Sequence, residues 1–162
     1  MNRIISKRVI KADIDKIWPL IEDITLIDTW HPGVETTDQL SDNAIGMGAV
    51  RRCNFYNGNQ AVEEVIALDK NYRIQINIRE FKAPMKHFIS TWQLTKMSDG
   101  ATQVSITTEY QMKFGVIGKI MDHLMIKPKM PKLIDRVLAG LDHHVMSGKR
   151  INQDFNLKPV AA

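Results

Sequence analysis

The 162-residue sequence contains a single cysteine, Cys53, and no long apolar run. One cysteine excludes an intrachain disulfide and leaves a thiolate metal site without a second thiolate. As a nucleophile, Cys53 would need an activating base beside it, so we expect Cys53 to be a small buried residue of the core instead. No apolar run reaches the roughly 18 residues that a membrane span requires, and the N-terminus lacks the pattern of an export signal. We therefore expect no transmembrane segment and a cytoplasmic location.

A strong excess of charge is also absent. The formal net charge is +4, and the densest basic cluster is Lys127, Lys129 and Lys132. Nucleic-acid binding favours a longer basic stripe with aromatic stacking groups, so we expect no nucleic-acid partner.

A metal or phosphate motif is missing as well. Four histidines lack the i, i+4 spacing of a ligand pair, and no acidic residue completes a ligand set around His87, His123, His143 and His144. The stretch Gly115–Lys119 lacks the spacing of a P-loop. The sequence predicts neither a metal nor a cofactor.

The composition is that of a folded globular protein, with 44% apolar and 25% charged residues. A chain of this length buries about 70% of its unfolded surface, which suits one core. We expect a single domain over residues 1–150 and a C-terminal tail over residues 151–162.

Hydrophobic periodicity predicts a strand, two short helical pieces and then a run of strands. The first strand covers Arg3–Ile10. The first helix follows the N-cap Asp13, and Pro19 should bend or shorten it; the second piece covers Asp23–Asp28. Six strands with turn signals between them follow, at Val34–Leu40, Gly48–Tyr56, Gln60–Leu68, Tyr72–Phe81, Lys86–Met97 and Thr102–Phe114. The pattern is typical of an antiparallel meander.

Helical periodicity returns after Gly115. We expect Pro128 and Pro131 to break this helix and a new helix to run from about Lys132 to Met146. A helix is about 10 Å across, whereas strands lie about 4.8 Å apart, so one helix cannot cover a seven-stranded sheet flatly. The sheet must curl around the helix or leave a space, and such an apolar space is a typical small-molecule site.

Five short motifs resemble a known family. They are W-H-P-G-V (30–34), G-A-V-R (48–51), E-E-V-I-A-L-D (63–69), A-P-M-K-H-F (83–88) and V-L-A-G-L (137–141). In order and spacing they resemble the polyketide cyclase/dehydrase branch of the SRPBCC superfamily, over about residues 3–147. The resemblance implies an α+β helix-grip fold, START-related and like the birch pollen allergen: a seven-stranded curved antiparallel sheet wrapped around a long C-terminal helix, with two short helices between strands one and two. It also implies a hydrophobic cavity under that helix, with catalysis in only some members.

Arg51 is the most informative charged residue. A two-residue turn at Asn57-Gly58 would place Arg51 opposite Glu64, whereas the resemblance implies Glu63 as the inward acidic partner. Both alternatives turn Arg51 inward. A buried arginine needs a partner, so the pair is either a structural strut or an anchor for a polar group of a ligand.

His31 stands between Trp30 and Pro32 at the entry to the second strand. A general base needs an orienting partner and a pocket position, and the sequence shows neither. We expect His31 to be structural or to contact a ligand, and Trp30 to fill the end wall of the cavity.

The expected ligand-binding residues share an inward strand position or an apolar helix stripe. They are Trp30, His31, Arg51, Cys53, Phe55, Glu63, Phe88, Trp92, Tyr110, Met112, Phe114, Met121, Met125 and Leu138. Core packing is the alternative for the aromatic residues and methionines. In the strand at 72–81, alternation buries Ile74, Ile76 and Ile78, whereas the family register would turn Gln75 and Asn77 inward.

The leading functional hypothesis is binding of a small hydrophobic or aromatic ligand, lipid-like or polyketide-like. The alternative is an aromatase/cyclase-type enzyme. Its catalytic residues are unknown from the sequence, and the candidates are Arg51, its glutamate partner and Tyr110. A third possibility is a protein-interaction module. The sequence leaves a monomer and a homodimer open.

Overall fold

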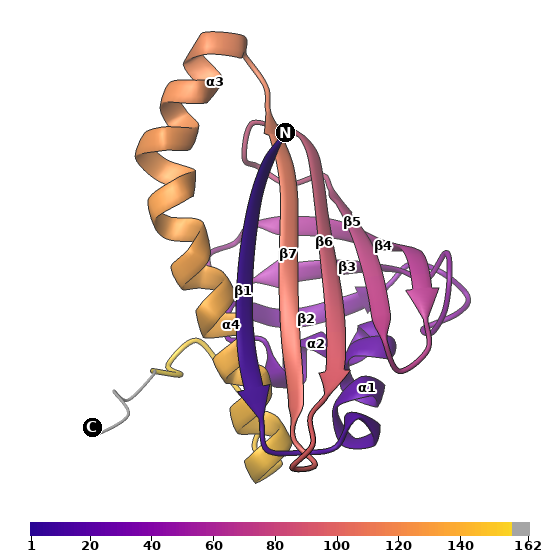
Figure 1. Cartoon of the computed structure of the whole chain (residues 1–162). Helices are drawn as coiled ribbons and strands as arrows, with labels where there is room; N and C mark the ends of the chain where they lie inside the picture. The colour runs from indigo at the N-terminus through magenta and orange to yellow at the C-terminus, as the bar shows by residue number, and fades with distance from the viewer. Residues whose placement is uncertain (157–162) are drawn as a thin grey trace.

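The computed structural model describes residues 1–156 of the chain. Seven strands form one antiparallel sheet in the order β1-β7-β6-β5-β4-β3-β2 (Figure 1). The strands are β1 (Asn2–Ile10), β2 (Val34–Gln39), β3 (Val50–Phe55), β4 (Gln60–Asp69), β5 (Arg73–Arg79), β6 (Met85–Lys96) and β7 (Thr102–Met112). The expected meander is confirmed, and only strand ends differ from the predicted bounds.

Three short helical segments connect β1 to β2. They are α1 (Ile14–Glu22), the 3-10 turn η1 (Ile24–Leu26) and α2 (Ile27–Trp30). Pro19 lies inside α1, and the helix ends three residues later. Asp23 begins the next turn, because its carboxylate accepts a hydrogen bond from the Thr25 amide at 2.9 Å.

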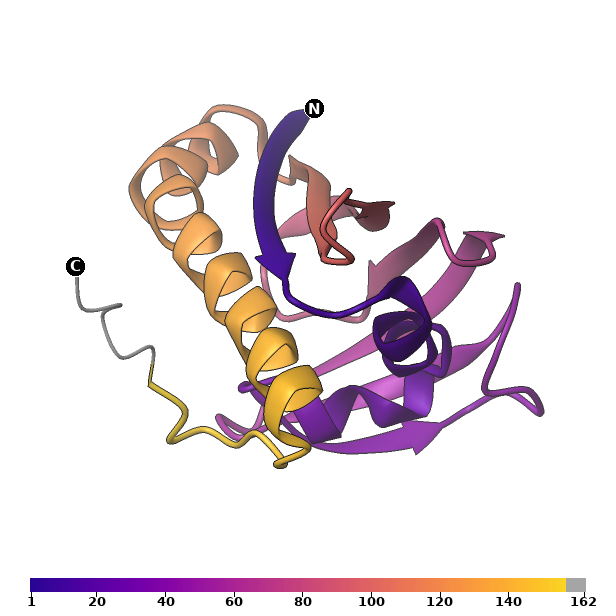
Figure 2. The same ribbon diagram turned by 60° about the horizontal axis from the view of Figure 1, so that its bottom comes forward.

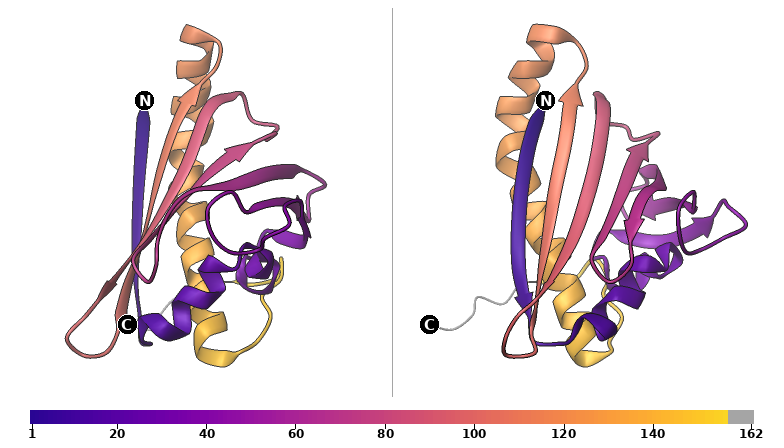
Figure 3. Two further views of the ribbon diagram at one scale, coloured as in Figure 1. Left: turned by 90° about the vertical axis from the view of Figure 1, so that its right-hand side faces the viewer. Right: turned by 45° about the vertical axis from the view of Figure 1, so that its right-hand side comes forward.

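The sheet is strongly curved. Figure 3 shows β1, β7 and β6 running along the long helix, while β3 and β2 turn across its far end near α1 and α2. A β-bulge between Val65 and Ala67 of β4 lies in the bent half of the sheet, where an extra residue increases local twist. The helix-grip architecture predicted from the motifs is confirmed.

The C-terminal helix is one continuous element of 33 residues. It comprises α3 (Gly115–Met121), the π-helical turn η2 (Asp122–Ile126) and α4 (Lys127–Ser147). The predicted break at Pro128 and Pro131 is therefore wrong. Pro128 is the second residue of α4, and the residue four positions before it, Leu124, lies in the π turn. The wider turn is therefore at the place where the proline ring would otherwise crowd a preceding carbonyl.

The long helix packs closely on the loop that holds α2. A Cβ atom at Gly140 would lie 2.5 Å from the Trp30 carbonyl oxygen and 2.9 Å from the Pro32 ring. Glycine at this position therefore lets α4 approach the backbone, and Leu138 and Leu141 on either side are buried. Figure 2 shows α4 crossing the open side of the curved sheet, with residues 148–156 returning beneath it.

Residues after α4 are part of the packed structure. The Ile151 side chain is 3% exposed and its amide donates to the Thr29 carbonyl at 2.8 Å. Arg136 of α4 donates to the Gln153 carbonyl at 2.6 Å. Of the tail predicted at 151–162, residues 157–162 lie outside the described part, and the boundary at 150 stays a prediction.

Between residues 1 and 156, no helix combines the length and apolar character needed to cross a bilayer. The cytoplasmic location stays a prediction of the sequence.

Candidate ligand-binding cavity

A cavity of about 400 Å³ lies between the concave face of the sheet and α4. This volume is within the range of small-molecule sites, about 300–1,000 Å³. Its walls are mainly apolar and include Ile76, Ile78, Phe81, Phe88, Trp92, Ile106, Met130, Ile134 and Val137. Three lining residues, Asn57, Leu133 and Gln153, are solvent-exposed and mark where the cavity opens. The cavity lies where the sequence predicts a space, between the sheet and a helix too narrow to cover it.

Arg51 and Glu63 form the charged pair of the cavity. The two residues are direct partners across β3 and β4, and each is less than one-tenth exposed. The Arg51 Nε donates to Glu63 Oε2 at 2.8 Å, and its Nη2 donates to the same oxygen. Glu64 instead pairs with Arg79, at 2.8 Å and partly exposed. The register implied by the family is right, and the two-residue turn is wrong.

The hairpin geometry explains this register. Asn54 pairs with Gln60, and four residues, 56–59, lie between β3 and β4 instead of two. The Gly58 amide donates to the Phe55 carbonyl at 2.8 Å, and the Phe55 amide donates to the Asn59 carbonyl at 2.9 Å. A longer turn shifts the pairing and changes which glutamate faces Arg51.

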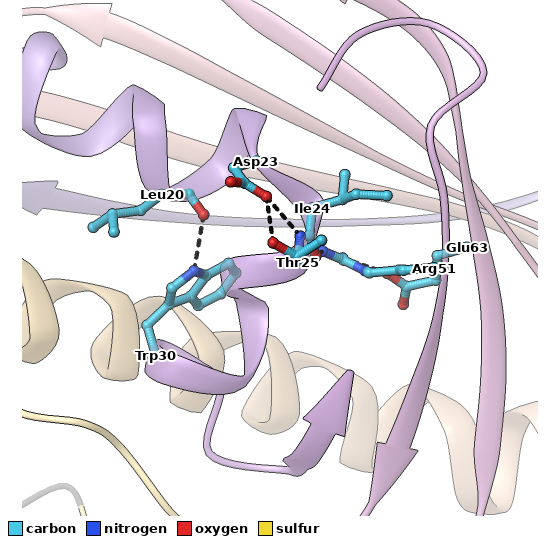
Figure 4. A network of polar contacts seen from close by, with 7 residues as sticks. All are labelled: Leu20, Asp23, Ile24, Thr25, Trp30, Arg51 and Glu63. Carbon is cyan, nitrogen blue, oxygen red and sulfur yellow. Dashed lines mark hydrogen bonds and ion pairs between the residues drawn. The ribbon is translucent and has the colours of Figure 1, made fainter. Parts of the chain in front are cut away.

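Arg51 also joins the sheet to the connecting segment. Its Nη1 donates to the Ile24 carbonyl of η1 at 2.6 Å, beside the Asp23–Thr25 and Trp30–Leu20 hydrogen bonds (Figure 4). Burial lowers the pKa of Arg51, but the charge and hydrogen bonds of Glu63 outweigh it and raise the pKa above its ordinary value. The guanidinium stays charged, and each of its three nitrogens donates a hydrogen bond within the protein.

The two carboxylate oxygens of Glu63 differ in their contacts. Both arginine hydrogen bonds end on Oε2, and no N–H or O–H group among residues 1–156 donates to Oε1. The Glu63 side chain lines the cavity. Oε1 can therefore accept a hydrogen bond from a hydroxyl group in the cavity.

The two ring nitrogens of His31 also differ in their contacts. Its Nδ1 accepts a hydrogen bond from the Gly33 amide at 3.0 Å, and burial, followed by the charge of Arg51, lowers the pKa of His31 to about 3. The neutral ring then carries its proton on Nε2. No acceptor for Nε2 occurs within the described ranges, and the ring lines the cavity, so Nε2 can donate to a carbonyl or hydroxyl oxygen.

Two hydroxyl groups add to the polar lining. Ser90 on β6 and Thr108 on β7 are direct partners, both are buried, and both line the cavity. The cavity thus offers neutral donors and acceptors, a carboxylate oxygen of Glu63 and the guanidinium of Arg136, which donates to the Gln153 and Phe155 carbonyls.

Of the fourteen expected ligand-binding residues, the structure brings six to the cavity wall: His31, Arg51, Phe55, Glu63, Phe88 and Trp92. Four are buried in the surrounding core but do not line it: Trp30, Cys53, Tyr110 and Leu138. Four lie away from it, half-buried or exposed: Met112, Met121, Phe114 and Met125.

Met121 and Met125 lie outside because the N-terminal end of the long helix extends past the sheet (Figure 1), and Met112 is the last residue of β7. Phe114 is not a strand residue, since β7 ends at Met112 and Phe114 has a left-handed φ of 66° directly before α3. The expectation that Phe114 and Met125 lie on the wall is corrected, because they are 67% and 49% exposed.

The buried residues outside the wall have other contacts. The Tyr110 hydroxyl donates to the Asp122 carboxylate at 2.6 Å, and the Trp30 indole donates to the Leu20 carbonyl at 2.9 Å. Trp30 also packs edge-on against Trp92, with ring centroids 5.6 Å apart. Burial raises the pKa of the Cys53 thiol, which keeps it protonated and unreactive.

The wall contains residues that the sequence did not indicate. Ser90 could have been found, because it shares a face with Phe88 and Trp92 at a spacing of two. Gln153 could not, because it reaches the cavity only through the return of the chain after α4. Arg136 could not either, because a charged residue within α4 carries no local signal that it lies at the wall. In the described part of the chain, no group of three histidine, cysteine or acidic side chains is arranged to hold a metal ion.

The positions of the β5 side chains show which of the two registers expected for this strand is right. Ile74 and Ile76 are buried, and Ile76 and Ile78 line the cavity. Gln75 faces the other side, where its amide donates to the Thr91 hydroxyl at 3.0 Å. Simple alternation is right, and the register that turns Gln75 and Asn77 inward is wrong for this chain.

A curved seven-stranded sheet that holds a long C-terminal helix over a cavity defines the START-like helix-grip class. The family model described as "Polyketide cyclase / dehydrase and lipid transport" matches residues 1–145. The chain belongs to this family, and the resemblance seen in its motifs is confirmed. No curated protein matched the chain by sequence.

Solved structures share the fold at low sequence identity. A START superfamily protein from Mycobacterium smegmatis has a TM-score of 0.73 at 12% identity, over 91% of this chain and 99% of that one. A protein from Thermus thermophilus has a TM-score of 0.73 at 18% identity, over 91% and 99%. DynU16, from the dynemicin biosynthetic locus, has a TM-score of 0.69 at 16% identity, over 93% of this chain and 49% of its own. These likenesses support the fold alone.

Proposed function

We propose that the cavity binds a neutral, mostly apolar small molecule that carries at least one hydroxyl or carbonyl group. Phenolic and polyketide-like molecules have this chemistry. The observation that carries the proposal is the pair of open hydrogen-bonding atoms in an apolar cavity: the Nε2 donor of His31 and the Oε1 acceptor of Glu63. Family membership supports the same class of ligand.

The charge pattern argues against an anionic ligand. Arg51 is committed to Glu63 and to the Ile24 carbonyl, and Arg136, the other cation on the wall, donates to the Gln153 and Phe155 carbonyls near the cavity opening. A carboxylate bound beside Glu63 would therefore meet its oxygen without an uncommitted cation next to it. Like charges in a poorly solvated site repel strongly. We therefore expect a neutral phenol to bind better than a carboxylate on the same ring system.

The proposal is tested with a matched pair of probes, 2-naphthol and 2-naphthoate, at pH 7. Binding to the folded state raises the melting temperature. We expect 2-naphthol to raise it, and 2-naphthoate to bind roughly tenfold more weakly or not at all. Equal affinity for both probes, or tighter binding of 2-naphthoate, would contradict the proposal.

Variants show whether binding uses the cavity. Ser90→Phe fills it from β6, whereas Thr91→Phe places the same ring on the opposite face of that strand. Binding of 2-naphthol should be lost in the first variant and kept in the second. His31→Asn tests the donor, because asparagine can still accept from the amide two residues on but does not reach into the cavity.

A second candidate function uses the same two groups. A donor on a ketone oxygen and a carboxylate near the adjacent carbon would assist enolisation, the step that an aromatase/cyclase promotes in a folded polyketone. Tyr110 does not reach the cavity, and Arg51 is committed to Glu63 and the Ile24 carbonyl. Of the expected candidates this leaves Glu63, and His31 joins it as the donor. The test is exchange of the α-protons of a bound 1,3-diketone in D₂O: acceleration that is lost in His31→Asn supports this function, and no acceleration contradicts it.

A further inference from the structure

The N-terminal end of the long helix carries an exposed apolar surface. We call it the helix-tip surface, and it consists of Phe114, Val116, Ile117, Ile120, Leu124 and Met125. Each of these residues is between 49% and 74% exposed. Single exposed apolar side chains are ordinary, but a contiguous set marks an interaction site. None of these residues lines the ligand cavity.

The inner side of this helix end is polar. Asp122 is 4% exposed and accepts hydrogen bonds from the Tyr110 hydroxyl at 2.6 Å and from the Asn2 amide at 2.9 Å. Gly118, also buried, lies against the end of β7. These contacts fix the rotation of the helix, so the apolar stripe of Val116, Ile120 and Leu124 must face outward. An amphipathic helix that points its apolar side away from the protein lacks its partner.

The charge around this surface has one sign. Five exposed lysines flank or interrupt it along the chain, Lys113, Lys119, Lys127, Lys129 and Lys132, of which Lys127 lies 3.5 Å from the Asp122 carboxylate. The single acidic residue between positions 113 and 132 is Asp122, which is buried. Exposed apolar side chains with a basic border are the features of a surface that lies on anionic lipid.

We propose that the helix-tip surface docks the protein on a bilayer that contains anionic lipid. The apolar residues enter the boundary between headgroups and acyl chains, and the lysines contact the headgroups. A second copy of the chain fits this surface less well, because a symmetric contact would bring the same lysines of both copies together. The end of the helix beyond the sheet is free to lie on a flat surface (Figure 1).

Vesicle flotation tests this proposal with the full chain. Vesicles of phosphatidylcholine with phosphatidylserine are compared with vesicles of phosphatidylcholine alone, at about 0.1 M and about 0.5 M NaCl. We expect binding to the anionic vesicles that weakens at high salt. Equal binding to both vesicle types, or no binding to either, overturns the proposal.

Matched variants locate the contact. Val116→Glu/Ile120→Glu/Leu124→Glu should weaken vesicle binding by roughly tenfold or more, and Lys119→Gln/Lys129→Gln should weaken it by a similar factor. The control is Ile45→Glu/Met47→Glu, because these residues are also exposed but lie in the loop between β2 and β3. Equal loss in the control overturns the assignment.

The molecular mass in solution tests whether a second copy of the chain, instead of a bilayer, covers the helix-tip surface. A molecular mass of two chains that returns to one chain in the triple-glutamate variant would assign the surface to a second copy and overturn the proposal. Circular dichroism and the melting temperature should stay near wild type in every variant, since all the replaced side chains are exposed.

Discussion

Arg51 of β3 and Glu63 of β4 face each other inside the curved sheet, and Arg51 also reaches the Ile24 carbonyl at 2.6 Å. One guanidinium thus joins two strands and the segment that follows α1. The sequence left strut and ligand anchor as alternatives for this pair. The hydrogen bonds of Arg51 support a strut, whereas the open oxygen of Glu63 supports a ligand contact, so the two roles fall on different residues.

Replacing Arg51 by methionine should strongly destabilise the fold. The change leaves the Glu63 carboxylate buried without its cation and the Ile24 carbonyl without its donor, and breaking such a pair costs about 3–5 kcal/mol. Urea unfolding monitored by circular dichroism measures the loss.

The double variant Arg51→Met/Glu63→Leu is the control for that loss. Replacing both charges by apolar groups of similar volume removes the unpaired charge, so stability should return by at least about 2 kcal/mol relative to the single variant. A double variant no more stable than Arg51→Met would show that the pair itself is not the cause.

Gly140→Ala should also destabilise the protein. In an unobstructed helix this change stabilises by about 1 kcal/mol. Here the new methyl group would meet the Trp30 carbonyl oxygen and the Pro32 ring, so we expect a net loss of about 1–3 kcal/mol. Thermal unfolding decides the sign, and a raised melting temperature would mean that α4 lies farther from α2 than the structure shows.

The stability should fall between pH 6.5 and about 3 because of His31. Its pKa in the folded protein is about 3, below the ordinary 6.5, so within this window only the unfolded chain binds the proton. The free energy of unfolding then falls as the pH falls, by at most about 1.4 kcal/mol per pH unit. His31→Asn should lose this part of the dependence in urea titrations at several pH values. Parallel pH profiles of the two proteins would contradict the buried neutral state.

The folded unit should extend beyond residue 150. Ile151 is buried and its amide pairs with the Thr29 carbonyl, so Ile151→Ala should cost about 2–4 kcal/mol. Asn152→Ala is a matched control, since Asn152 is exposed. Equal melting temperatures for the two variants would support a domain that ends at residue 150.

The strands and their faces could be predicted because alternation is a local signal. Ile74 and Ile76 face inward as their spacing of two requires. The partner of Arg51 could not be fixed from spacing, because it depends on the loop at residues 56–59, where Asn57-Gly58 equally fits a tighter turn.

The orientation and the continuity of the long helix could not be predicted, for a different reason. Its apolar stripe at Ile120 and Leu124 has the same period as a core-facing stripe, and only the tertiary contacts of Asp122 with Tyr110 and Asn2 turn it outward. Pro128 predicted a break because nothing local announces the π turn before it. Tertiary contacts overrode both local signals.

Nuclear magnetic resonance with isoleucine methyl labels tests the central claim most directly, since these methyl groups report the bound position of 2-naphthol. The account predicts nuclear Overhauser effects between the naphthol ring and the methyl groups of Ile76 and Ile106, which line the cavity. Contacts only to Ile117 and Ile120, on the exposed end of the helix, would contradict it.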